Sequence, residues 1–511
     1  MKKHWILPLI VVTIGIFLLV IQNYKESTTP PSESWSREVD IATTTVRSGV
    51  DAIQKKDATY TVAYFSEDAL VERTYDKNLE ATGKVETPLA DGTGADVFTG
   101  EERTIYFSDD GIYEAGTEEA IADARLFRPL EEGVLYVSDA ELFYMDGASL
   151  ETMKIAENIT EDASIHAYET KEELIVSVST AEDNHVSSVL YRYQEGDVST
   201  FEEIRVELSP SLKMDEVYPL LGDNKPELLI SAVPAFQRSS SGKKDFYTTT
   251  ADGDDHTLSA LSFPDPETGA SLEEIEDLQV TAEESAILFR AQGFTETKTG
   301  GSEAFNVYEG RVEEGKVIAT RRSNTPRLSV APASVSGEVV AWLDIGADQN
   351  TVFLSAATDH EGFPSASLTE DTALRTAGKT MMMLSTGLMT IVLTIMWYSP
   401  PLLLMSAWTF RRRNPFDDEK EWSFYGTIAL YTAVALLFHH HLFKAQVVEA
   451  LPSFLGFPGS PFVVILVFSL VALAIVKVSD LDKWWGIPGR ISYFIGLHIL
   501  FMTVFIGPYL Y

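Results

Sequence analysis

Four histidines near the C-terminus come closest, by type and spacing, to a chemical site. His439, His440 and His441 are consecutive, and His498 follows in a later apolar stretch. Histidine ligates metals and haem, and ionisable groups within apolar spans are functional candidates. Consecutive helical residues point about 100° apart, and the depths of His439 and His498 in their spans differ by roughly 12 Å. One small ion therefore cannot be bound by His439 and His498 together. Haem is kept as an alternative cofactor. The other interpretation is that the histidines lie at the membrane interface and bind no cofactor.

A second candidate lies in residues 222–230, which read GDNKPELLI. This segment resembles the end of the calcium-binding loops in FG-GAP-type propeller blades, where an Asp/Asn-rich loop precedes Pro, an acidic residue and Leu. The resemblance implies Ca²⁺ at Asp223 and Asn224. These two are all that remain of the family's alternating ligands, whereas calcium takes six to eight oxygens. No metal is therefore predicted, and Ca²⁺ at Asp223 and Asn224 is kept as an alternative.

The sequence contains no motif for other kinds of chemistry. GxSxG, HExxH, GxGxxG and P-loop patterns are absent, and the chain has no cysteine, which excludes thiol catalysis and disulfides. His166, His185, His256 and His360 are isolated and are expected to be ordinary surface or turn residues. A carboxylate pair could act among the many acids, but nothing singles one out. No catalytic or cofactor-binding residue is predicted, and a non-enzymatic protein is favoured.

The charge is concentrated in the middle of the chain. Residues 26–375 contain 27 Lys and Arg against 69 Asp and Glu, a formal charge of −42, compared with −37 for all 511 residues. Such a field repels nucleic acid and anionic lipid, so no nucleic-acid partner is expected. It favours cations, cationic partners or simply solubility outside the cell.

Apolar segments flank this acidic section. Residues 1–23 contain an apolar run of about 17 residues, the short limit for a membrane span. No small-x-small cleavage site follows, which favours a signal anchor over a cleaved signal peptide. Residues 24–37 are rich in Ser, Thr and Pro and are expected to be a linker to a domain of residues 38–375.

The C-terminal region, residues 376–511, is expected to be a four-helix transmembrane region. With the N-terminal anchor it gives five spans, the last four at about 379–410, 424–443, 462–478 and 491–506. The positive-inside rule orients them through Lys2, Lys3, Arg411, Arg412 and Arg413. We therefore expect a bacterial cell-membrane protein with a cytoplasmic N-terminus, an outside acidic domain and an outside C-terminus. Pro400 and Pro401 predict a kink or break in the second span.

Residues 38–375 are predicted to be all-β, because short apolar runs alternate with Gly, Asp, Asn and Glu clusters. Strand–turn–strand units recur with a mean spacing of 46 residues, at Tyr64, Tyr106, Tyr136, Ile175, Leu229, Leu288 and Val340. That spacing is typical of four-stranded propeller blades. A seven-bladed β-propeller is predicted, with six or eight blades and a pair of β-sandwiches as alternatives. The 30-residue unit that follows Tyr106 is short for a blade.

Together these features predict a membrane-anchored surface protein. Its extracytoplasmic propeller would bind a protein, peptide or envelope polymer as a scaffold or sensor, and its spans could contact other membrane proteins. The alternative is an accessory or core subunit of a membrane transporter or redox complex that uses the C-terminal spans.

Overall fold

The computed structural model describes residues 3–510 apart from 91–92, 110, 171–172, 183, 195, 222–225, 236–243, 253–254, 282–285, 294–304, 326, 348, 359–369, 411–420, 445–446, 449–450, 453 and 480–484. The chain divides into two compact units. The β unit comprises residues 29–296 and 303–366. The helical unit comprises residues 1–28, 297–302 and 367–511.

The β unit contains five four-stranded antiparallel sheets. In chain order, they consist of β2 (Val50–Gln54), β3 (Tyr60–Phe65), β4 (Ala69–Tyr75) and β5 (Ala81–Pro88); β6 (Gly94–Thr99), β7 (Thr104–Ser108), β8 (Gly111–Glu114) and β9 (Ala122–Asp123); β10 (Leu126–Pro129), β11 (Gly133–Ser138), β12 (Glu141–Asp146) and β13 (Thr152–Glu157); β14 (Ser164–Glu169), β15 (Leu174–Glu182), β16 (His185–Gln194) and β17 (Asp197–Glu207); and β18 (Leu212–Leu221), β19 (Pro226–Pro234), β20 (Asp245–Asp252) and β21 (Asp255–Leu261).

An eight-stranded sheet completes the unit. Its strands are β22 (Glu273–Val280), β23 (Ala286–Gln292), β24 (Phe305–Glu313), β25 (Lys316–Arg321), β26 (Leu328–Ser336), β27 (Val339–Ile345), β28 (Asn350–Ala356) and β1 (Val39–Thr44). Its two halves are joined by one parallel pair, Phe305 with Leu328, between β24 and β26. The first strand of the unit, β1, pairs with its last strand, β28, so the chain closes on itself.

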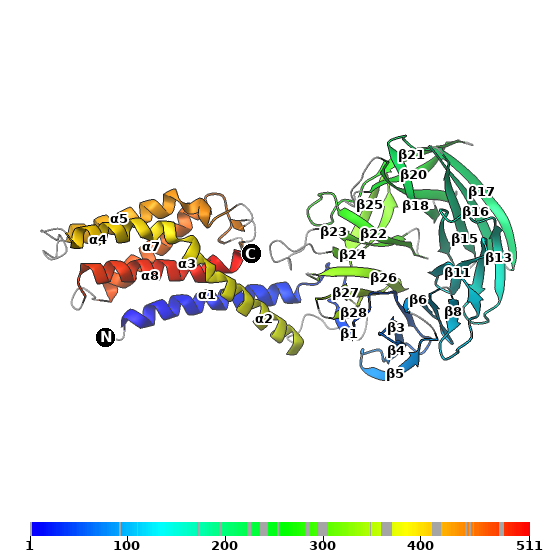
Figure 1. The fold of residues 1–511 in the computed structure, drawn as a ribbon, viewed down its shortest axis with the longest axis horizontal. Helices are drawn as coiled ribbons and strands as arrows, with labels where there is room; N and C mark the ends of the chain where they lie inside the picture. Colours follow the sequence, from blue (N-terminus) through cyan, green and yellow to red (C-terminus); the bar gives the residue numbers. More distant parts are fainter. Residues whose placement is uncertain are drawn as a thin grey trace. The chain divides into compact units, whose positions relative to one another are not determined.

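The sheets follow one another around the β unit in chain order (Figure 1). Contacts join the first strands of successive sheets: β2 with β6, β6 with β10, β14 with β18 and β18 with β22. Strand β26 then contacts both β22 and β2. Between β10 and β14 the link is made by the backbone N–H groups of Glu131 and Glu132, which donate to Glu169 Oε2 at 2.7 and 3.1 Å.

The seven strand pairs predicted from the sequence are all antiparallel pairs in the structure. They are β3–β4, β7–β8, β11–β12, β15–β16, β19–β20, β23–β24 and β27–β28. The 30-residue spacing after Tyr106 is accommodated because β8 has four residues and β9 only two. Strands such as β3 and β28 are buried at every position, since both faces of their sheets are covered, and therefore read as unbroken apolar runs.

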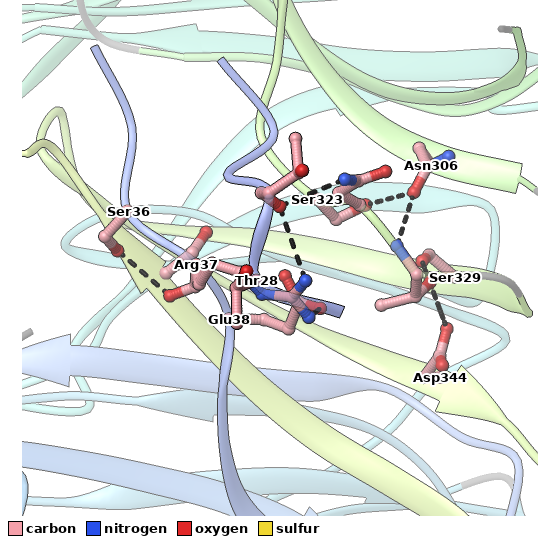
Figure 2. A network of polar contacts seen from close by, with 12 residues as sticks. Thr28, Ser36, Arg37, Glu38, Asn306, Ser323, Ser329 and Asp344 are labelled. Carbon is pink, nitrogen blue, oxygen red and sulfur yellow. Dashed lines mark hydrogen bonds and ion pairs between the residues drawn. The ribbon is translucent and has the colours of Figure 1, made fainter. Parts of the chain in front are cut away.

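Residues 29–36 of the predicted linker lie against the β unit. The Trp35 side chain is 3% exposed, its Nε1–H donates to Ser355 Oγ at 2.7 Å, and the Arg322 guanidinium lies 3.7 Å from its ring centroid. The neighbouring polar network is buried too (Figure 2): the Asn306 side-chain oxygen accepts from Ser323 Oγ at 3.1 Å. This segment is thus held by specific contacts on the sheet that β1 closes.

The helical unit consists of α1 (Lys3–Thr28), α2 (Glu370–Gly387), α3 (Met389–Leu393), α4 (Ile395–Thr409), α5 (Glu421–Leu437), η1 (His439–His441), α7 (Ser460–Val478), α8 (Ile487–Phe505) and η3 (Gly507–Tyr509). Helix α8 packs against α1, α5 and α7. Within the described residues, three helical segments are long and apolar enough to cross a membrane: His4–Lys25, Ser460–Val478 and Ile487–Phe505.

A fourth such element is a pair of helical segments, Thr372–Leu393 and Ile395–Ala407, that bend by 44° where they meet. The helix is not broken at Pro400 and Pro401, because both prolines are inside α4, and a kink at these prolines stays a prediction. The residues before the bend lie close to α8. A Cβ on Gly387 would meet Thr503 O at 2.9 Å, and α3 contacts α8.

Candidate functional site

The three consecutive histidines lie in η1, directly after the end of α5. His439 Nδ1 is 2.9 Å from the backbone oxygen of Leu436, to which it can donate. His440 and His441 are exposed, and their ring centroids are 4.3 Å apart. The rings of these three histidines contact Phe438 and Phe462. The ring of His498 has other described neighbours, namely Trp397, Tyr431 and Phe494.

His498 is fully buried in α8 and both of its ring nitrogens have protein partners. Nδ1 lies 2.9 Å from the Tyr431 hydroxyl, and Nε2 lies 3.2 Å from the backbone oxygen of Ile465. Because a carbonyl can only accept, Nε2 carries the proton and Nδ1 accepts from the hydroxyl. No cofactor is predicted at these four histidines, haem stays an untested alternative, and at His498 ligation would require breaking one of these hydrogen bonds.

The other predicted residues are in parts of the chain that are not described. Asp223 and Asn224, the calcium alternative, lie outside the described residues, as do Lys2, Arg411, Arg412 and Arg413. Lys3 is the first residue of α1, and its side chain is not described. Among the residues that are described, no group of three or more His, Asp or Glu could hold a metal ion.

A polar pocket of about 310 Å³ opens in the β unit, at the first strands of four successive sheets. Its lining consists of Arg128 from β10, His166 from β14, Glu216 and Tyr218 from β18, Glu276, Asp277 and Leu278 from β22, and Lys244 before β20. A volume above about 300 Å³ is in the range of small-molecule and peptide-terminus sites. Convergence of side chains from separate sheets makes this pocket the candidate functional site.

On one side of the pocket, His166 and Glu216 form a hydrogen-bonded pair. Burial lowers the pKa of His166, so the neutral ring donates its Nε2–H to Glu216 Oε2 at 2.7 Å. Burial opposes ionisation of Glu216, but hydrogen bonds from His166 and Ser164 outweigh it and lower its pKa to about 2. The Tyr218 ring packs on the imidazole with centroids 4.1 Å apart. Glu216 is therefore a hydrogen-bond acceptor in a fixed position, and the Tyr218 ring packs on its partner His166.

Strand β22 brings two acids to the opposite side. Consecutive strand residues normally face opposite ways, but β22 has register shifts on both sides of Glu276, and Asp277 has a φ of 53°. Arg290 consequently reaches both carboxylates, pairing with Glu276 through Nη2 and with Asp277 through Nε at 2.7 Å. Asp277 also accepts from the backbone N–H of Ala331 in β26 at 3.2 Å.

The two remaining charged residues of the lining differ in their partners. Lys244 Nζ lies 2.8 Å from Asp215 Oδ2, and the carboxylate also accepts from Ser231. The side chain of Arg128 has no hydrogen bond or ion pair with any residue that the structure describes, and its Nε is buried without an acceptor. Its charge acts only at longer range, on Asp96, His166 and Glu216.

Carboxyl groups continue along the neighbouring first strands. Burial raises the pKa of Asp51 in β2 to about 7, although its Oδ2 accepts the Thr99 N–H at 2.6 Å. Burial also raises the pKa of Asp96 in β6 to about 6. The first strands of the sheets therefore carry ionisable groups outside the pocket as well.

None of the pocket residues was predicted from the sequence. The expectation for His166 is wrong, because it sits in a strand and pairs with Glu216; His256, predicted as a surface residue, is likewise close to Glu202, at 3.2 Å. His185 begins β16, and His360 lies outside the described residues. The available signal was an ionisable residue beside an apolar one in a first strand, as in Phe127–Arg128 and Ile165–His166.

No protein-family model and no curated protein matches the chain. Solved structures that it resembles include the N-terminal domain of Nup159 (12% identity, TM-score 0.37, 64% of this chain and 97% of that chain). Others are a PL25 polysaccharide lyase, an ulvanlyase (10%, 0.41, 66% and 99%), and TolB from Acinetobacter baumannii (11%, 0.29, 59% and 80%). Since all these TM-scores are below 0.5, the description of the fold rests on the strand pairing of this chain.

Proposed function

We propose that this chain is a membrane-anchored binding protein whose β unit, a seven-bladed β-propeller outside the cell, takes its ligand in the pocket around Arg128 and Glu216. The ligand belongs to a protein, a peptide or an envelope polymer. The observation that carries the proposal is the pocket itself, whose lining comes from four sheets that are far apart in the sequence.

The count of seven blades is supported by the strand order. Five sheets have four strands each, and the eight-stranded sheet divides at the single Phe305–Leu328 pair into β22–β25 and the set β26, β27, β28 and β1. Pairing of β1 with β28 lets the N-terminal strand complete the last blade, so the ring is closed by main-chain hydrogen bonds.

The membrane placement is supported by composition and charge. Among the described residues, three apolar helices and one bent pair are long enough to span a membrane, and the β unit lies in the acidic section of the chain. We propose five spans, the fifth being α5 and η1, with the N-terminus cytoplasmic and the C-terminus outside. In this orientation the residues that decide topology fall on the cytoplasmic side, namely Lys2, Lys3, Arg411, Arg412 and Arg413. Protease added to intact cells should release an acidic β-rich fragment of roughly 35–40 kDa; protection of residues 40–370 would contradict this topology.

Binding in the pocket can be tested by site-specific photo-crosslinking of the full-length protein in its native membrane. A photoreactive residue in place of Lys244 should give a defined adduct with the ligand, because Lys244 lines the pocket. The matched control places the same residue at Val85, which is 57% exposed in β5 and outside the lining. An adduct at position 244 alone supports the proposal, whereas equal adducts at both positions, or none at 244, would refute it.

A further inference from the structure

We infer that the pocket receives a carboxylate group of the ligand and that the Arg128 guanidinium binds it. This inference rests on the proposed function and adds the chemical class that the pocket selects. The evidence for it is which charged side chains of the lining have a partner and which have none.

Every other charged group of the lining already has a partner of opposite charge or a fixed hydrogen bond. Glu216 accepts from His166 and Ser164, and Lys244 pairs with Asp215. Glu276 and Asp277 share Arg290, as described above. Two negative charges remain, one on Glu216, because His166 is neutral, and one from the two carboxylates that share Arg290. Of the two cationic side chains in the lining, Lys244 is paired with Asp215, and Arg128 has no hydrogen-bond or ion-pair partner among the described residues.

Arg128 is also unsatisfied as a hydrogen-bond donor. A guanidinium presents five N–H donors in a rigid planar fork and cannot lose its proton. Its Nε is buried without an acceptor among the described residues. Leaving a buried donor unpaired is costly, and a carboxylate accepting two parallel N–H bonds is the planar partner that fits the fork. Because Nε itself is buried, we infer that a carboxylate entering the pocket is bound by the terminal Nη1 and Nη2 groups of Arg128.

The rest of the pocket accommodates more than the carboxylate. About 310 Å³ holds a peptide terminus or a sugar ring. Tyr218 and Leu278 supply apolar surface, and the Tyr218 hydroxyl makes no hydrogen bond to a described residue. A C-terminal residue of a peptide and a uronate of a polysaccharide both provide a carboxylate next to a body of this size.

The acidic field of the β unit shapes the affinity. A formal charge of −42 over residues 26–375 opposes the approach of any free anion. Screening limits that opposition to about 8 Å at physiological ionic strength, whereas the hydrogen bonds to Arg128 act in contact. Lone carboxylates should therefore bind weakly, in the millimolar range, with the ligand body adding the remaining affinity.

The test titrates full-length protein in detergent with four probes and follows binding by saturation-transfer NMR. The probes are N-acetyl-dialanine, its C-terminal amide, glucuronate and glucose. The two acids should bind and the two neutral probes should bind at least about tenfold more weakly, because charge-assisted hydrogen bonds are lost. The tighter acid identifies the source, a peptide terminus or an acidic polysaccharide. If the amide binds as well as the acid, or if neither acid binds, the inference is wrong.

Variants of Arg128 test whether this side chain, and not another cation, binds the acid probes. Arg128→Ala should weaken acid binding at least about tenfold, and Arg128→Lys, which keeps the charge without the fork, should weaken it by a smaller factor. The control is Arg103→Ala, which removes an arginine already paired with Glu114 at 3.1 Å and should leave probe binding unchanged. Arg128→Lys serves as the deciding variant if Arg128→Ala fails to fold. Unchanged binding in it and in a folded Arg128→Gln variant would overturn the inference.

Failure of this inference is distinguishable from failure of the proposed function. An adduct at position 244 without carboxylate binding would leave a binding pocket of different specificity. Carboxylate binding without an adduct would show the reverse, a carboxylate site that holds no partner in the membrane.

Discussion

Two ionisable side chains, one in each unit, differ in how their polar atoms are paired. In the helical unit His498 is completely buried, and both ring nitrogens are occupied by Tyr431 and Ile465. In the β unit Arg128 is partly exposed at a pocket, and its Nε has no acceptor among the described residues. One ionisable group therefore stabilises the packing around it, while the other is available to a ligand.

This difference follows from the architecture of the two units. Helices satisfy their own backbone, so a polar side chain between them is paired locally with a neighbouring helix. In a ring of sheets, side chains of the first strands converge on a centre where no further strand can cover them. What sets Arg128 apart is its place in the lining of a pocket, because buried polar atoms without a described partner also occur among the helices, for example at Thr390 and Arg490.

The largest effect should come from the contacts that hold the start of the β unit. Trp35→Ala removes a side chain that is 3% exposed, its hydrogen bond to Ser355 and its stacking on Arg322. The free energy of unfolding of the β unit should fall by about 3–5 kcal/mol, the usual cost of truncating a buried aromatic residue. Denaturant unfolding followed by far-UV circular dichroism measures it. Trp5→Ala is the control, since Trp5 is 69% exposed and should leave this transition unchanged. A Trp35 effect no larger than the Trp5 effect would show residues 29–36 to be a plain linker.

The stability of the β unit should depend on pH because of Asp344. This carboxyl is 2% exposed and accepts from Thr325 Oγ1 at 3.0 Å and Ser329 Oγ at 3.2 Å (Figure 2). Burial raises its pKa to about 7. Because the folded-state pKa exceeds the unfolded value, the contribution to stability is complete below about pH 4 and is lost as the pH rises through 7. The loss should be on the order of 2–4 kcal/mol.

Asp344→Asn should remove this dependence and make the β unit more stable than the wild type at pH 8. Thermal unfolding at pH 5 and pH 8 compares the two proteins. Asp57→Asn is the control, because Asp57 is exposed and its pKa is lowered by hydrogen bonds from Thr59, so no stability is lost above pH 7. If Asp344→Asn keeps the wild-type pH profile, this carboxyl is ionised in the folded protein.

For the helical unit, His498→Leu tests whether the histidine is structural. The substitution leaves the buried Tyr431 hydroxyl without its partner, and an unpaired buried polar group costs about 1–3 kcal/mol. Thermal unfolding of the full chain in detergent should show this loss. His441→Leu, at an exposed position of η1, should cost nothing measurable. The purified wild type should also lack a haem Soret band; a band that disappears with His498→Leu would assign the histidine to a cofactor.

The parts of the fold that could be predicted are those set by neighbouring residues in the sequence. Tyr64 pairs with Val71 and Tyr106 with Tyr113 because alternating side chains flank a tight turn, and this pattern is visible locally. The ends of α7 and α8 follow from the length of their apolar runs. The first strands have no such signal, since Leu126–Pro129 is four residues long and pairs only through β11.

The pocket could not be predicted because it depends on which sheets become neighbours. Arg128, Glu216 and Asp277 are 88 and 61 residues apart along the chain, and the packing of four successive sheets brings them together. Asp277 in addition faces the pocket through an irregular β22, which the alternation of a regular strand would not foresee. Sequence reasoning placed the candidate chemistry at the histidines because those residues cluster along the chain.

The smallest expected effect concerns the bend between α2 and α4. Local reasoning assigns it to Pro400 and Pro401, whereas the structure places it at the α3–α4 junction, where Thr394 Oγ1 bonds to Thr390 O at 2.7 Å. Because the chain has no cysteine, spin labels can be attached at single cysteines replacing Met381 and Leu403, which are 73% and 70% exposed. Replacing both prolines by alanine should leave the distance between the labels unchanged in pulsed electron spin resonance. A longer distance would mean that the prolines do maintain the bend, and that this helix follows local sequence as the hairpins of the β unit do.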